Sequence, residues 1–283
     1  MIGALEGFLL GPFESFGFMR LALVACGALA LANAPIGVLL LLRRMSLDAD
    51  VLSHAVIPGA ALGFLYAGYS LAALSLGGFL TGLVVAALGG VVARFLAKRQ
   101  DGTLAAFYLY ALALGVMIIS VRGSNLDLMH VLFGTVLAID AKALLLIAVI
   151  SSAIMLTLAA FYRPLAVETI DPSFLRTIAG GGPLFRALFI VLVILVLVAS
   201  FQAFGTLFAI GPILLPAATA RCWTARVGPM VALAAAIGLL ADYAGLLISY
   251  WANQPSGPAI VLAGGTLYGL SLIVAGLREP HRG

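Results

Sequence analysis

The sequence predicts an all-α, polytopic membrane protein, and three observations support this. Of the 283 residues, 64% are hydrophobic and only 9% are charged, whereas soluble domains carry about 25% charged residues. The apolar residues form runs long enough to cross a bilayer as helices, which takes about 17–25 residues. The 32 glycines suit the close approach of helices in lipid. We therefore expect a single transmembrane domain over residues 1–283.

About eight to nine transmembrane helices are expected along the chain. A shorter apolar run at about 205–220 contains Gly211-Pro212 and Pro216, and is either a ninth span or a broken helix. The eight longer runs lie at about 18–42, 53–69, 71–97, 104–121, 143–162, 184–203, 228–250 and 258–277.

The 15 Lys and Arg residues predict the orientation. With nine crossings and the N-terminus outside, only Arg20, Arg122 and Lys142 fall on the outer side. The remaining basic residues fall inside, as the positive-inside rule requires, and the C-terminus then lies in the cytoplasm. Because the basic residues stand singly or in pairs and form no basic tract, we expect no nucleic-acid partner.

Two connections are long. Residues 122–142 are too polar to span the membrane and too apolar for an ordinary loop, which favours a re-entrant or interfacial segment on the outer side. Residues 163–183 form the longest cytoplasmic segment. There Asp171-Pro172 is typical of a helix start, and a short helix over 173–179 is expected. Such a helix is a place for a soluble partner to contact, although an ordinary structured loop is the alternative.

The strongest candidate for chemistry is the pair Asp50 and His54. Four residues apart in a helix, their side chains lie on one face. Ionisable groups inside an apolar span are costly unless they face the protein interior or a watery path, and a carboxylate with an imidazole suits a divalent transition metal. The alternative is that Asp50 caps the helix and His54 bonds to a neighbouring helix. Pro58 follows one turn later and predicts a kink.

Other acidic and histidine residues are weaker candidates for a pathway. Asp242 is the carboxylate within its span and is expected to face the bundle interior. Its role there is on a cation path, in a helix-helix hydrogen bond or as the partner of an arginine. Asp127 and His130, three residues apart, form either a polar site near the outer mouth or an interfacial anchor.

The sequence has no motif for ATP hydrolysis or proteolysis. Lys98 and Lys142 lie in no phosphate-binding loop, and neither His-Glu-x-x-His nor Gly-x-Ser-x-Gly occurs. We therefore expect no enzymatic activity in this chain. If ATP drives transport, another chain must hydrolyse it.

Several motifs resemble those of the membrane permease subunits of bacterial zinc and manganese ABC importers. The first is Arg43-Arg44-Met45-Ser46 followed by Asp50-Val-Leu-Ser-His54-Ala-Val-Ile-Pro58-Gly59. The others, in the same order and spacing, are Asp127-Leu-Met-His-Val-Leu-Phe-Gly134, Leu215-Pro-Ala-Ala-Thr-Ala-Arg221, and Pro255-Ser-Gly-Pro258 with Val261. The resemblance covers nearly the whole chain.

This resemblance implies an importer of zinc or manganese, or of iron, in the bacterial cytoplasmic membrane. The permease would pair with a second copy of itself, with two cytoplasmic ATPase subunits that bind ATP, and with an extracytoplasmic metal-binding protein. The chain itself would bind no cofactor, and the metal would be cargo. The metal residues would be Asp50 and His54. The segment Asp171–Ala179 of this chain would be the coupling helix that seats in the ATPase, with contacts from Asp171, Pro172, Phe174, Leu175 and Arg176.

Two alternatives stay open beside the resemblance. A proton- or sodium-coupled secondary transporter would use the same acids, but inverted repeats are not evident in the sequence. An intramembrane enzyme would need a nucleophile-base pair or a fuller metal motif. Within the resemblance, Asp48 adds a second carboxylate where relatives commonly have uncharged residues, but the four-residue spacing to His54 favours Asp50.

Overall fold

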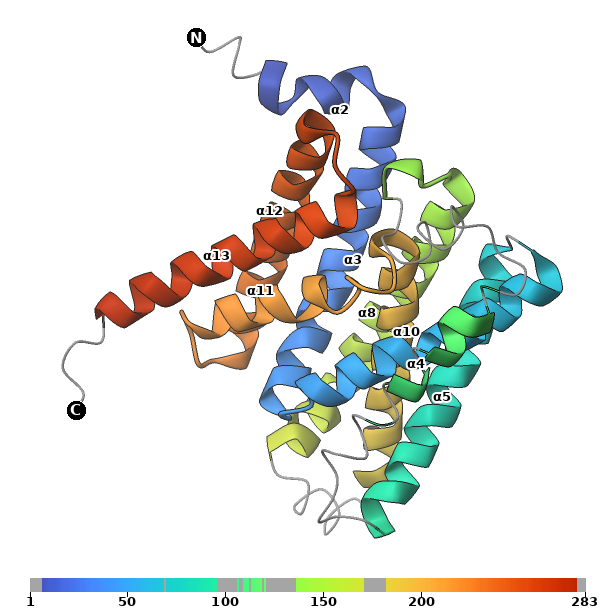
Figure 1. Cartoon of the computed structure of the whole chain (residues 1–283). Coiled ribbons are helices and arrows are strands. Elements are labelled where there is room, and N and C mark those ends of the chain that lie inside the picture. Colours follow the sequence, from blue (N-terminus) through green and yellow to red (C-terminus); the bar gives the residue numbers. More distant parts are fainter. Residues whose placement is uncertain are drawn as a thin grey trace.

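The protein forms a bundle of helices in the computed structural model (Figure 1). The structure describes residues 7–68, 70–95, 106, 109–111, 113–118, 120, 136–170 and 182–278. Across these residues the regular structure is helical, with no strand. The predicted all-α class is confirmed.

Seven of the described helices are long and apolar enough to cross a membrane. They are α3 (Gly17–Leu42), α4 (Ser46–Ala67), α5 (Leu71–Phe95), α8 (Ala141–Ile170), α10 (Gly182–Phe204), α12 (Val227–Ala252) and α13 (Ser256–Arg278). Shorter elements are α2 (Gly11–Ser15), η2 (Val136–Ala138) and α11 (Gly211–Arg221). A further apolar helix lies at Leu109–Ile118.

The run at 205–220 is a broken helix and not a full span. Helix α10 ends at Phe204, and Gly205 follows with a φ of +80°, a backbone conformation that glycine adopts without steric cost. Pro212 then stands in the first turn of α11. The 11 residues of α11 extend about 16 Å, roughly half the thickness of a bilayer core. The alternative of a ninth full span is therefore excluded for this run.

Two predicted boundaries were wrong. The second span was expected from residue 53, but α4 already begins at Ser46, because Asp48 in its first turn is favourable at the positive end of a helix. The span at 143–162 was expected to end before Arg163, but α8 continues to Ile170. Its backbone is non-helical at Phe161, with φ −115° and ψ 17°, three residues before Pro164. The helix resumes after this kink.

Two ends of the bundle can be told apart by the chain segments that lie there (Figure 1). At one end, the Phe8 ring stacks on Trp251 with centroids 5.0 Å apart, and the Tyr243 hydroxyl donates a hydrogen bond of 2.9 Å to the Leu9 carbonyl. The start of α3 and the α12–α13 turn therefore lie together. The α3–α4 turn and the start of α10 lie toward the opposite end. That this second end faces the cytoplasm stays a prediction from the charges.

Helices α4 and α5 pack backbone against backbone. A Cβ atom at Gly59 would collide with the Gly77 carbonyl and the Thr81 hydroxyl, and one at Gly63 would collide with the Ala73 carbonyl. Glycines four residues apart on α4 thus form the flat strip on which α5 lies, an arrangement typical of helix pairs in lipid. This pair fixes the direction of α4 and of the polar side chains that it carries.

We expect Gly59→Ala to destabilise the α4–α5 pair. The added methyl group meets backbone atoms that cannot rotate away, so the expected loss of stability is about 1–3 kcal/mol. Thermal unfolding of the purified protein in detergent measures it. Gly90→Ala is the matched control, because a Cβ atom there meets nothing within 4 Å. An unchanged unfolding temperature for Gly59→Ala would contradict this packing.

Candidate functional site

Helix α4 brings Asp50 and His54 onto one face. The His54 Nε2 atom lies 3.8 Å from the Asp50 Oδ1 atom, beyond hydrogen-bond length but close enough for both to reach one ion. The Ser53 hydroxyl is directed elsewhere, since it donates a hydrogen bond of 2.7 Å to the Asp50 carbonyl within the helix. The sequence prediction that the two side chains share a face is therefore confirmed by the geometry.

The two side chains differ in exposure. The His54 side chain is 8% exposed, whereas the Asp50 side chain is 45% exposed. His54 lies eight residues after the start of α4, about 12 Å along the helix, and so within a helix that is long and apolar enough to cross a membrane. A carboxylate that is open on one side of a membrane-spanning helix needs a polar partner on that side. The Asp50 carboxylate is therefore not enclosed by the packing of this chain alone.

Asp48 does not share this face. At 100° per residue, Asp48 lies about 120° around the helix from His54, whereas Asp50 lies about 40° away from it. The structure thus favours Asp50 over Asp48 as the partner of His54.

The described part of one chain holds no group of three or more His, Cys, Asp or Glu side chains able to bind a metal ion. Asp50 and His54 thus supply two protein ligands, while structural and catalytic transition-metal sites commonly have three or four. Any ion bound there needs further donors from water or from another chain.

Asp242 lies in a different place. It is buried, at 3% exposure, and it lines a small cavity with residues of the broken helix α11, among them Gly211 and Pro216, and with Val261 of α13. The expectation that it faces the interior is met, but the structure does not bring it together with Asp50 and His54. A role on the ion path stays a prediction.

Several other predicted residues lie outside the described residues. These are Asp127 and His130 on the outer segment, and Asp171, Pro172, Phe174, Leu175 and Arg176 of the predicted coupling helix. Where the structure resumes before α8, the Asp140 carboxylate accepts a hydrogen bond of 2.8 Å from the Ala143 amide.

Sequence reasoning missed one polar cluster. Arg43 forms a buried ion pair with Glu168, near the end of α8. Arg43 was counted among the cytoplasmic basic residues and in the first motif that resembles the metal permeases, but no partner was predicted for it, and Glu168 had no role. The two residues are far apart in the chain, and no spacing rule connects them. The only signal was a lone carboxylate, Glu168, close behind an apolar run.

Comparison with known proteins identifies the family. Residues 15–275 match the ABC 3 transport family. The chain belongs to this family of membrane permeases. It is 32% identical to the manganese transport system membrane protein MntC of Halalkalibacterium halodurans over 91% of this chain and 87% of that protein. It is 29% identical to a probable iron transport system membrane protein of Haemophilus influenzae, over 97% and 94% of the two chains.

A solved structure agrees with this assignment. The chain superposes on a chain of PsaBC from Streptococcus pneumoniae in complex with Fab with a TM-score of 0.84, at 28% identity, covering 96% of this chain and 95% of that one. The family resemblance seen in the motifs is thus confirmed, and so is the expectation that this chain is a membrane-embedded permease subunit and not itself an enzyme.

Proposed function

We propose that this permease carries a divalent transition metal inward across the bacterial cytoplasmic membrane, with ATP hydrolysed by a separate subunit. The observation that carries the proposal is the Asp50–His54 pair, which presents a carboxylate and an imidazole on one face of α4, a candidate membrane span. Membership of an ABC transporter family supports an ATP-driven step. A secondary transporter that uses the same acids would run without any ATPase subunit.

For the cargo, we place manganese first. One carboxylate and one imidazole suit zinc, manganese and iron alike, so the site alone does not decide. The relative from Halalkalibacterium is named for manganese, and the one from Haemophilus for iron. Uptake assays should therefore compare all three ions, with zinc as the third.

The site is proposed to be shared by two copies of the chain. Two ligands per chain become four when the α4 faces of two protomers meet across a two-fold axis, which satisfies the usual ligand count. The 45% exposure of Asp50 in the single protomer leaves its carboxylate open to such a partner. No resident cofactor is needed, because the metal is substrate.

Two further partners complete the proposed importer. A cytoplasmic ATPase pair contacts the segment around Asp171–Ala179, and an extracytoplasmic binding protein delivers the ion to the outer face. The charge asymmetry of the sequence supports this polarity. It also places the C-terminus in the cytoplasm.

We expect Asp50→Asn and His54→Ala each to reduce metal uptake at least about 100-fold, because loss of a direct ligand exceeds the 10–100-fold effects known for residues behind the ligands. Uptake of radioactive manganese into cells that express the whole transporter measures this. Asp48→Asn is the matched control, since it removes a carboxylate from another face of the same helix and should retain uptake. Normal uptake by Asp50→Asn would refute the proposed site.

For the coupling segment, we expect Phe174→Asp or Leu175→Asp to separate ATP hydrolysis from transport. A charge at an apolar contact with the ATPase would weaken the docking that joins the two activities. ATP hydrolysis and metal uptake are measured together in proteoliposomes. Cross-linking that places residues 174 and 175 far from the ATPase would exclude this assignment.

The orientation is tested by labelling single cysteines in a background without Cys26 and Cys222. Gln254 and Ala225 are both exposed, and replacing either leaves the charges that set the topology unchanged. We expect Gln254→Cys to react with a membrane-impermeant thiol reagent in intact cells, and Ala225→Cys to react only after permeabilisation. The reverse pattern would overturn the import polarity.

A further inference from the structure

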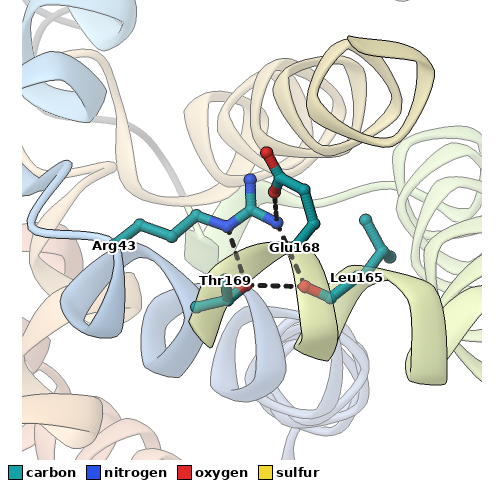
Figure 2. A network of polar contacts seen from close by, with 4 residues as sticks. All are labelled: Arg43, Leu165, Glu168 and Thr169. Carbon is teal, nitrogen blue, oxygen red and sulfur yellow. Dashed lines mark hydrogen bonds and ion pairs between the residues drawn. The ribbon is translucent and has the colours of Figure 1, made fainter. Parts of the chain in front are cut away.

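Arg43, just after α3, contacts both α8 and α10 through one buried side chain, and Figure 2 shows its contacts with α8. Its guanidinium pairs with the Glu168 carboxylate of α8, and the two side chains are only 7% and 8% exposed. Its Nε donates a hydrogen bond of 2.9 Å to the Thr169 hydroxyl, and a terminal nitrogen donates one of 3.2 Å to the Leu165 carbonyl. The guanidinium carbon also lies 3.9 Å from the centre of the Phe189 ring of α10.

This cluster uses the shape of an arginine side chain in a way that a lysine cannot reproduce. A planar guanidinium directs several N–H groups in fixed directions and stacks on an aromatic ring. Burial lowers the pKa of Arg43, and the Glu168 carboxylate opposes that shift. The guanidinium is nevertheless a cation, because arginine is not deprotonated in proteins. Thr169 in turn donates a hydrogen bond of 2.7 Å to the Leu165 carbonyl, which ties the last turn of α8 into the same cluster.

The part of α8 that Arg43 holds lies beyond a kink. The non-helical backbone at Phe161 and the proline at 164 interrupt the helix, because proline has no N–H to donate and bends the turn before it. Leu165, Glu168 and Thr169 therefore belong to a short terminal arm of α8. This arm leads directly into the chain after Ile170, where the ATPase contact is proposed.

On its other side, Arg43 adjoins α4 through a short turn. Arg44 adopts a left-handed backbone with φ +56°, and the Met45 amide donates a hydrogen bond of 3.0 Å to the Leu40 carbonyl, which closes the end of α3. Helix α4 begins at Ser46 and carries Asp50 at its second turn. Any displacement of Arg43 therefore shifts the start of the helix that holds the metal ligands.

We propose that Arg43 is a positioning residue that links the terminal arm of α8 to the start of α4, so that movement of the arm moves Asp50 and His54. This inference rests on the proposed function, because it assigns a coupling role for ATP-driven transport. The cluster connects the α3–α4 turn with the α8 arm through the Arg43–Glu168 ion pair, and with α10 through the Phe189 ring. Its loss should separate ATP hydrolysis from metal movement and leave the ligands themselves intact.

The test measures ATP hydrolysed and manganese transported by the complete transporter in proteoliposomes, and compares their ratio among variants. We expect Arg43→Gln to raise the number of ATP molecules hydrolysed per ion by about tenfold, the size expected when contacting residues are energetically coupled. Glu168→Gln should raise the ratio as well, and the double variant should exceed Arg43→Gln by little, because both single changes break the same link.

Arg44→Gln is the matched control. It removes the same charge at the next position, but Arg44 is exposed, and the ratio should stay near that of the unaltered protein. If Arg43 had only a structural role, Arg43→Gln would lower ATP hydrolysis and metal transport in proportion. The number of ATP molecules hydrolysed per ion would then be unchanged, and this result would overturn the proposal. If Arg43→Gln yields no assembled transporter, Glu168→Gln and Thr169→Val decide by the same criterion.

Asp50→Asn in the same assay keeps this inference distinct from the proposed function. Normal transport by Asp50→Asn would remove the metal site on which both rest. Loss of transport by Asp50→Asn together with a normal ratio for Arg43→Gln and Glu168→Gln would reject the link alone.

Discussion

The cost of placing a charge inside an apolar bundle governs this structure. Moving an isolated ion from water into a low-dielectric interior costs several kcal/mol even after relaxation, so each ionisable group within the described helices needs a reason to be there. Arg43 and Glu168 meet this cost by pairing, with added hydrogen bonds to Thr169 and Leu165. Asp50 is 45% exposed in the single chain, so a second chain or an ion, as proposed, has to meet this cost. The Arg43–Glu168 pair is satisfied within the chain, whereas Asp50 stays accessible to a partner or an ion.

The close packing of α4 on α5 makes the open site usable. A metal ligand must be held to within about half an ångström of its working position, and a single helix in lipid has little to hold it. The contacts of Gly59 and Gly63 with the α5 backbone bring the two helices together at backbone distance, and the buried Ser53–His54 side of α4 adds further packing. Rigidity in this pair also means that α4 moves as a unit, so a shift at its start reaches His54.

The sequence was sufficient for whatever depends on local pattern. Hydropathy located the long helices, and the four-residue spacing placed Asp50 and His54 on one face, because helical geometry alone decides it. The sequence pattern gave wrong boundaries where contacts between distant parts of the chain determine the length of a helix. Hydropathy stopped the fifth span near residue 162, yet α8 continues to Ile170, where Glu168 and Thr169 contact Arg43 from a distant part of the chain. The run at 205–220 stayed ambiguous in the sequence because its length suits either alternative. In the structure, the turn at Gly205 and the 11-residue length of α11 show that the helix is broken.

The exposure of the two ligands suggests how an ion can be both held and released. Because the described part of one chain supplies only two donors at this site, the proposed four-ligand shell exists only while two α4 helices face each other. Metal–nitrogen and metal–oxygen bonds of about 2.0–2.2 Å tolerate little separation, so a relative shift of an ångström or two between protomers would break the shell without unfolding either helix. Such a shift requires a force applied near the start of α4. The start of α4 adjoins Arg43, which contacts the terminal arm of α8. The buried Arg43–Glu168 pair therefore lies where its movement can act on Asp50 and His54.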